Sequence, residues 1–172
     1  MRWAWGRAIL FTLILLAGAP WAAILSGWLR GHHLLRIVVG AASALLILYL
    51  IIDLRWRLRI VDWRAYAFLS VIGGAALLLA QGVTSVEEKI HFLEFTLLAF
   101  FFFKAVKFSQ KGARLYGISL LLTTLVGWID EIWQGILPQR VYDVRDVFFN
   151  ACGGMIGVGV GWVRQAYGRE AA

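Results

Sequence analysis

The sequence predicts an all-α integral membrane protein: a bundle of about six transmembrane helices, with both termini cytoplasmic, in a single transmembrane domain that spans residues 1–172. Hydrophobic residues make up 61% of the 172 residues and charged residues only 16%, and the mean hydropathy is +0.76. This composition leaves too few polar residues to cover a soluble globule. Two segments, 8–29 and 65–86, contain no Asp, Glu, Lys, Arg or His, and each exceeds the roughly 20 residues that a helix needs to cross a bilayer.

The first expected span is 8–29. Arg2 and Arg7 precede it, and a segment rich in small residues follows at 18–23, so a cleaved signal peptide is the alternative interpretation. The apolar run continues through Leu29, which makes it longer than the apolar part of an ordinary signal peptide. We therefore expect the first helix to be retained.

Five further apolar segments complete the expected set of spans. One is the uncharged segment 65–86, and the last segment in the chain is also uncharged. The fourth and fifth spans carry their ionisable residues near their ends. The remaining expected spans are 34–52, 90–108, 115–135 and 147–163.

Lys and Arg residues divide unevenly between the two ends of this bundle. Of the 17 Lys and Arg residues, 12 lie at the N-terminus, in the second and fourth connections or in the C-terminal tail, and 5 lie at the opposite end. Because the cytoplasmic connections of membrane proteins are enriched in Lys and Arg, we expect both termini in the cytoplasm. The third and fifth connections are then extracytoplasmic.

Ionisable residues gather in two stretches that both belong to the expected extracytoplasmic end. An ionisable side chain within a bilayer costs roughly 2.5–3.5 kcal/mol, so a chain that groups several of them is expected to use them. The first stretch holds Glu87, Glu88, Lys89, His91 and Glu94. The second stretch holds Asp130, Glu131, Arg140, Asp143, Arg145 and Asp146.

Helical spacing places these residues on shared faces. Residues three or four positions apart lie on one side of a helix, which groups Glu87, His91 and Glu94. The same spacing groups Glu131 and Gln134 on the next helix, with Asp130 one turn before Gln134. We therefore expect a single cavity, open to the extracytoplasmic side, that is lined by His91, Glu94, Glu131, Arg140, Asp146 and Asn150.

The last expected helix carries two different features. Gly153, Gly157 and Gly161 recur every four residues, a spacing that lets another helix approach closely, so we interpret them as packing residues. Asp146 and Asn150 continue this face toward the expected extracytoplasmic end. Asp146 has a second interpretation as the N-cap of the helix, a role worth about 1 kcal/mol.

Several segments in the second half of the chain resemble the VanZ-like family of membrane proteins. The resemblance covers about residues 87–161 and rests on segments 88–95, 130–134 and 137–143, on Asp146 with Asn150, and on Gly153 with Gly154. It implies a small multi-pass protein of the bacterial inner membrane, linked through the name-giving member to low-level resistance to the glycopeptide teicoplanin. Phe95 departs from the family, which often has Tyr at this position.

The grouped residues suit acid–base chemistry on a phosphorylated lipid. Histidine titrates near neutrality, and carboxyl groups near lipid are driven toward the protonated form, so the cluster is expected to supply both an acid and a base. Cationic side chains suit phosphate recognition, and Arg145 is a further candidate for it. The candidate catalytic residues are His91, Glu94, Asp130, Glu131 and Asp146, and the candidate substrate-binding residues are Lys89, Gln134, Arg140, Asp143 and Asn150.

The expected partners are membrane lipids, with a lipid-linked cell-envelope precursor as the substrate and no nucleic acid. A network of buried salt bridges, for example from Arg140 to Asp130 or Glu131, is the architectural alternative. A divalent metal is less favoured, because His91 is the one nitrogen ligand among many oxygens, and the cofactor is otherwise unknown. The alternative functions are a non-catalytic lipid- or glycopeptide-binding protein and, less favoured, a transporter.

Overall fold

The computed structural model describes residues 1–81, 86–137 and 142–168, except for the side chains at positions 23, 77, 80, 87 and 88. Every regular element in these residues is helical, which confirms the all-α class. The elements are α1 (Arg2–Gly31), α2 (Leu35–Ile52), the π-helix η1 (Asp53–Arg57), α3 (Trp63–Gln81), α4 (Val86–Val106), α5 (Gly112–Ile136) and α6 (Val144–Tyr167).

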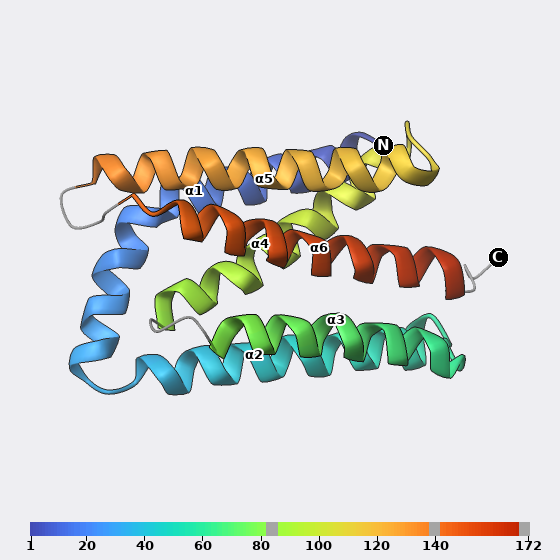
Figure 1. Ribbon diagram of the computed structural model, residues 1–172, viewed down its shortest axis with the longest axis horizontal. Helices are drawn as coiled ribbons and strands as arrows, with labels where there is room; N and C mark the ends of the chain where they lie inside the picture. The colour runs from blue at the N-terminus through green and yellow to red at the C-terminus, as the bar shows by residue number, and fades with distance from the viewer. Residues whose placement is uncertain (82–85, 138–141, 169–172) are drawn as a thin grey trace.

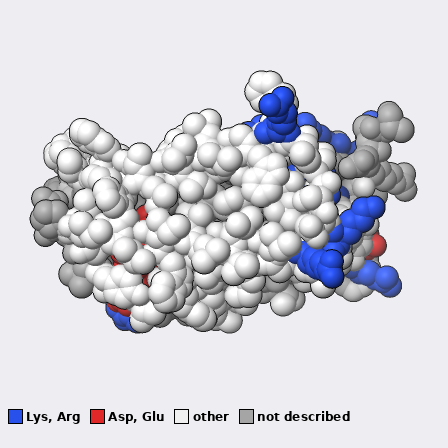
Figure 2. Space-filling model, turned by 90° about the horizontal axis from the view of Figure 1, so that it is seen from above, with Lys and Arg blue, Asp and Glu red and all other residues white. Residues whose placement is uncertain are grey.

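The long helices run back and forth along the long axis of the molecule, so both chain termini lie at one end (Figure 1). We call this the terminal end. The opposite end, where α1, α3 and α5 end and α2, α4 and α6 begin, is called the site end (Figure 1). Lys and Arg side chains gather at the terminal end of the face shown in Figure 2. The uneven division of positive charge in the sequence is therefore present in the fold.

Four helical segments of the described residues are long and apolar enough to cross a membrane, and the expectation of six is corrected to four. Of the expected span 65–86, α3 covers the described residues as far as Gln81, and it begins with Trp63 and Arg64; residues 82–85 lie outside the described residues. α4 contains too many charged residues to count as an apolar span, because Lys89, Glu94 and Lys104 all lie within it. The four candidate spans are Arg2–Ala22, Leu35–Arg57, Gly112–Ile136 and Val144–Tyr167.

α4 lies in the middle of the bundle, in contact with α1, α5 and α6 (Figure 1). Its closest neighbour is the glycine face of α6. A Cβ atom added at Gly153 would lie 2.9 Å from the carbonyl oxygen of Phe92, and one added at Gly157 would overlap the carbonyl oxygen of Thr96. The Thr96 hydroxyl donates a hydrogen bond to the carbonyl oxygen of Gly153 at 3.1 Å. The predicted packing role of the α6 glycines is thus confirmed.

α1 is a 30-residue helix whose second half turns away from the first (Figure 1). Pro20 lies inside the helix, and proline kinks helices because it lacks an N–H donor and its ring crowds the preceding turn. Before this bend, Ala8 and Leu15 pack with Phe95 of α4 in a buried apolar cluster. The first half of α1, which begins at the terminal end, is therefore held beside α4 and α5.

A buried ion pair joins η1 to α6 at the terminal end. Asp53 is only 3% exposed, and its carboxylate accepts a hydrogen bond from the guanidinium of Arg164. Arg57, four residues further along η1, lies 3.7 Å from the same carboxylate. Because the buried Asp53 has a cationic partner on another helix, this pair fixes the start of the connection to α3 against the end of α6.

Candidate functional site

The candidate site centres on the imidazole ring of His91, near the start of α4. Its Nδ1 atom lies 3.4 Å from Oε2 of Glu94 on the same helix and 3.9 Å from Oδ2 of Asp130 on α5. His91 is 8% exposed and Asp130 is fully buried, whereas the Glu94 side chain is 36% exposed. The ring therefore lies between one accessible and one buried carboxylate.

Gln134 orients the buried carboxylate. Its Nε2 atom donates a 2.8 Å hydrogen bond to Oδ2 of Asp130, the oxygen that faces His91. This contact joins positions four residues apart on α5, so the helix itself sets its geometry. Further along the buried face of α5, the hydroxyls of Ser119 and Thr123 instead donate to backbone carbonyls of the same helix, at 2.7 and 2.8 Å.

The His91 group forms one wall of a cavity of about 230 Å³ between α1, α4 and α5. The opposite wall is almost entirely apolar and comes from α1. The polar lining residues are His91, Glu94, Asp130 and Gln134, and the α1 lining residues are Phe11, Ile14, Leu15, Gly18, Ala19 and Ala22. Sequence reasoning missed the α1 wall, although Gly18, Ala19 and Ala22 share one side of the helix.

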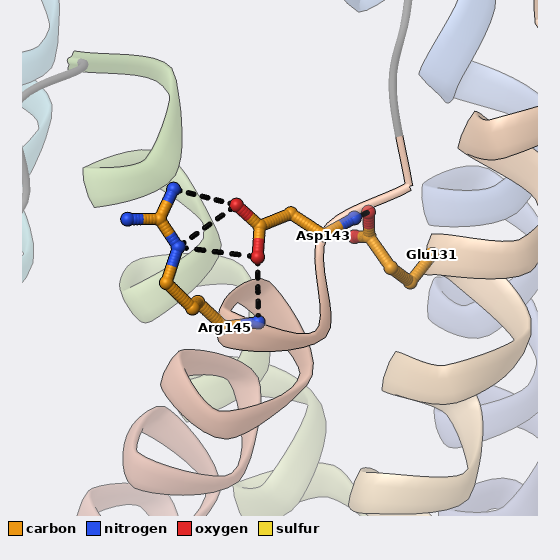
Figure 3. A network of polar contacts seen from close by, with 3 residues as sticks. All are labelled: Glu131, Asp143 and Arg145. Atoms are coloured by element: carbon orange, nitrogen blue, oxygen red, sulfur yellow. Dashed lines mark hydrogen bonds and ion pairs between the residues drawn. The ribbon is translucent and has the colours of Figure 1, made fainter.

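Glu131, the neighbour of Asp130 in the sequence, makes a different contact (Figure 3). Its Oε1 atom accepts a 2.8 Å hydrogen bond from the backbone N–H of Asp143. The Asp143 carboxylate in turn accepts hydrogen bonds from the guanidinium of Arg145, at distances down to 2.6 Å. This chain of contacts ties the end of α5 to the start of α6.

The N-cap of α6 is Asp143 and not Asp146, which corrects one of the two interpretations of Asp146. α6 begins at Val144, three residues before the expected span, and the Asp143 carboxylate accepts a 2.9 Å hydrogen bond from the backbone N–H of Arg145. The side chain and backbone N–H groups of Arg145 hold the pKa of Asp143 below its ordinary value. Asp146 lies one position after Arg145, within electrostatic range of His91.

Buried polar atoms of α5 and α6 lack a hydrogen-bond partner among the described residues. They are Oε2 of Glu131 and both side-chain polar atoms of Asn150. Asn150 packs against Gly127 of α5 and near Phe95, because a Cβ added at Gly127 would lie 3.0 Å from the Asn150 Cβ and 3.3 Å from the Phe95 ring. Burying an unpaired polar group costs about 1–3 kcal/mol, so these atoms mark the interior beside His91 as a polar site.

The expected residues therefore divide into three sets. His91, Glu94, Asp130 and Gln134 line the cavity, Glu131 and Asp143 belong to the tie in Figure 3, and Asn150 is buried between α5 and α6. Lys89 is half-buried in the first turn of α4 and is not among the cavity-lining residues. Arg140 and the side chains of Glu87 and Glu88 lie outside the described residues.

No three His, Cys, Asp or Glu side chains in residues 1–81, 86–137 and 142–168 are grouped as a metal site. Cys152 is a buried free thiol on α6, away from the cavity lining. We therefore assign no metal ligands.

Apolar helices of spanning length, enclosing a His–carboxylate group beside an apolar wall, define a polytopic membrane protein with a buried polar site. A sequence model of the VanZ/LLP1 family matches residues 11–165, and the chain belongs to this family. The match confirms the resemblance and extends it to α1. An uncharacterized protein of Saccharomyces cerevisiae is 31% identical over 94 residues, which are 49% of this chain and 86% of the yeast protein. No solved structure matches the chain.

Proposed function

We propose that this protein acts on a lipid-linked cell-envelope substrate in the His91 cavity, by hydrolysis or group transfer with general acid–base catalysis. The observation that carries the proposal is the position of His91 between Glu94 and Asp130, on a polar wall that faces the apolar wall of α1. A polar wall and an apolar wall across one cavity suit a substrate with a polar head and a hydrocarbon chain.

The different exposures of His91, Glu94 and Asp130 support different roles in this reaction. Glu94 is the accessible carboxylate, so we assign it proton transfer to and from the substrate. His91 lies behind it and exchanges the proton with Glu94, because imidazole accepts and releases protons near neutral pH. Asp130, oriented by Gln134, stabilises the imidazolium that forms.

The remaining expected site residues take supporting roles in this proposal. Glu131 and Asp143 hold the start of α6 against α5. Asp146 adds negative charge near His91, and Asn150 offers a buried amide beside the site. Arg140 and Lys89 are the cations assigned to the phosphate of the substrate, since Arg and Lys are the usual phosphate ligands.

We place the protein in the bacterial inner membrane, with the terminal end in the cytoplasm and the site end outside. The support is the gathering of Lys and Arg at the terminal end (Figure 2), because cytoplasmic ends of membrane proteins carry this excess. In this orientation the cavity meets the outer leaflet, where lipid-linked envelope precursors are used.

A non-catalytic lipid-binding or glycopeptide-binding role is the second candidate function. The observation in its favour is the extent of the apolar wall, to which α1 contributes six residues from Phe11 to Ala22. Such a wall would hold a hydrocarbon chain without any reaction at His91. This role also gives a route to reduced teicoplanin susceptibility, through altered access to the cell-wall precursor.

The test uses susceptibility to teicoplanin of a sensitive bacterium that expresses the chain. We expect the protein to reduce susceptibility, and His91→Gln and Asp130→Asn to abolish this effect at unchanged membrane levels. Both variants nearly keep side-chain volume, but His91→Gln removes the ring that transfers the proton and Asp130→Asn removes the charge that stabilises the imidazolium. Glu131→Gln, which changes the adjacent carboxylate, is the matched control and should retain the effect. Full protection by His91→Gln would rule out the acid–base role in favour of the binding role.

A further inference from the structure

A second group of charged residues lies at the terminal end, far from the His91 cavity. Lys104 and Lys107, at the end of α4, line two cavities. The first, of about 230 Å³, also contains Arg7 of α1, and the second, of about 150 Å³, also contains Arg164 of α6. We call Arg7, Lys104 and Lys107 the terminal cation group.

The described carboxylates at the terminal end, Asp53 and Asp62, contact groups other than the terminal cation group. Asp53 pairs with Arg164 and Arg57, and Asp62 accepts a hydrogen bond from the backbone N–H of Arg64 at 2.9 Å. None of the three members of the terminal cation group has an ion-pair partner among the described residues. Lys104 instead experiences the like charges of Arg7, Lys107 and Arg57. Lys104 is half-buried, whereas Arg7 and Lys107 are exposed, and an anion stabilises such a group of like charges.

Aromatic rings flank these cations. The Lys104 Nζ atom lies 5.0 Å from the centroid of the Phe100 ring, and the Lys107 Nζ atom lies 5.9 Å from that of Phe108. Trp3 is 84% exposed and lines the first cavity with Phe101 and Phe108. Aromatic side chains beside Lys and Arg are typical of the level of lipid headgroups, where an apolar wall meets phosphate.

We propose that the terminal cation group binds the phosphate of an anionic phospholipid from the leaflet at the terminal end. The phosphate lies between Arg7, Lys104 and Lys107, and the acyl chains continue along the exposed aromatic surface. The site is distinct from the His91 cavity, because the two share no lining residue, and the proposal does not rest on the function of that cavity.

Thermal unfolding of the purified full chain in detergent tests the site, with phosphatidylglycerol, phosphatidylcholine or inorganic phosphate added. We expect phosphatidylglycerol to raise the midpoint of thermal unfolding. In the double variant Lys104→Gln/Lys107→Gln, the lipid concentration that gives half of this increase should be roughly tenfold higher or more. The reason is that one Lys near an anionic surface contributes about a fivefold change in affinity. Lys104→Arg/Lys107→Arg should retain the wild-type concentration.

The matched control is Lys111→Gln/Arg114→Gln, which removes the same charge from the same end but from residues that line neither cavity. It should behave as wild type. An equal response to phosphatidylcholine, or an equal loss in the control variant, would overturn the proposal, because either result means that no specific anion site exists. A full effect from millimolar inorganic phosphate would overturn the choice of a lipid as the ligand.

Discussion

Asp130 and Glu131 are adjacent carboxylates on α5 that face different helices. Successive residues of a helix point about 100° apart, so Asp130 turns toward His91 of α4 while Glu131 turns toward the start of α6. Asp130 is oriented by a side chain of its own helix. In the proposed function, Asp130 therefore takes part in the chemistry, whereas Glu131 supports the packing of α5 against α6.

Two replacements of Glu131 distinguish the hydrogen bond that it accepts from Asp143 from the effect of its negative charge. Glu131→Ala should lower the free energy of unfolding by about 1–3 kcal/mol, because the part-buried N–H of Asp143 loses its acceptor. Glu131→Gln retains an acceptor oxygen and should stay within about 1 kcal/mol of wild type. Thermal unfolding in detergent measures both, and equal midpoints for wild type and Glu131→Ala would contradict the support role.

The Asp143 cap gives a pH-dependent contribution to stability. Arg145 lowers the pKa of Asp143 below its ordinary value of 3.8, so the ionised cap stabilises the fold above that value and the contribution disappears as the pH falls through the lower, folded pKa. The gain should be below about 1 kcal/mol, because the pair is solvent-exposed. Thermal midpoints from pH 6 to pH 3 should converge between wild type and Asp143→Asn, and a constant difference would exclude this origin.

At the scale of elements, the contact between α4 and α6 positions the site. The α6 glycines let α4 approach so closely that a methyl group at Gly157 would overlap the backbone of Thr96. His91 lies on the same helix as Thr96, slightly more than one turn away. The closeness of the two backbones, together with the Thr96–Gly153 hydrogen bond, thus fixes the position of the helix that carries His91.

Alanine substitution of two glycines tests this contact. Gly157→Ala should destabilise the protein by about 1–3 kcal/mol, as overpacking of a tight contact does, and should also impair function through displaced α4. Gly117→Ala on α5 is the control, since a Cβ there meets nothing within 4 Å and alanine favours helix by about 0.5–1 kcal/mol. Thermal unfolding measures both variants. A midpoint of Gly157→Ala equal to that of the wild type would show that α4 and α6 have room to separate.

The sequence predicts the faces of single helices better than the cavity they form together. The three-residue spacing of His91 and Glu94 and the glycine face of α6 follow from helical periodicity, and both are present. The α1 wall depends on a bend and on packing against α4, neither of which periodicity encodes. The N-cap interpretation of Asp146 is wrong: Asp143 and Asp146 both precede the apolar run, and only the backbone shows that Asp143 accepts the N–H bond.

For the whole molecule, the family match begins at the residue where the cavity lining begins. The match covers residues 11–165, and it begins at Phe11, the first α1 residue of the cavity wall. The resemblance recognised from motifs begins only near residue 87, because α1 contributes apolar residues with no distinctive pattern. A short motif region therefore underestimated how much of the chain builds the site.

The charge asymmetry of the molecule predicts its orientation. Tyr142→Cys at the site end and Lys111→Cys at the terminal end, both in a Cys152→Ser background, report on opposite ends through exposed positions. An impermeant thiol reagent added to intact cells should label Tyr142→Cys and not Lys111→Cys, because Lys and Arg hold the terminal end inside. The reverse pattern would invert the orientation and place the His91 cavity at the inner leaflet.

The central claim is that the cavity between α1, α4 and α5 holds the lipid-linked substrate, and mass spectrometry of lipids that co-purify with the protein tests it most directly. Gly18 lines the cavity, and a Cβ there meets no protein atom within 4 Å, so Gly18→Leu adds a bulky side chain to the cavity wall. Gly117→Leu, on α5 and outside the cavity lining, is the control. We expect a phosphorylated lipid carrier to co-purify with the wild type and with Gly117→Leu, and to be lost from Gly18→Leu. Equal recovery of this lipid from all three proteins would contradict the claim.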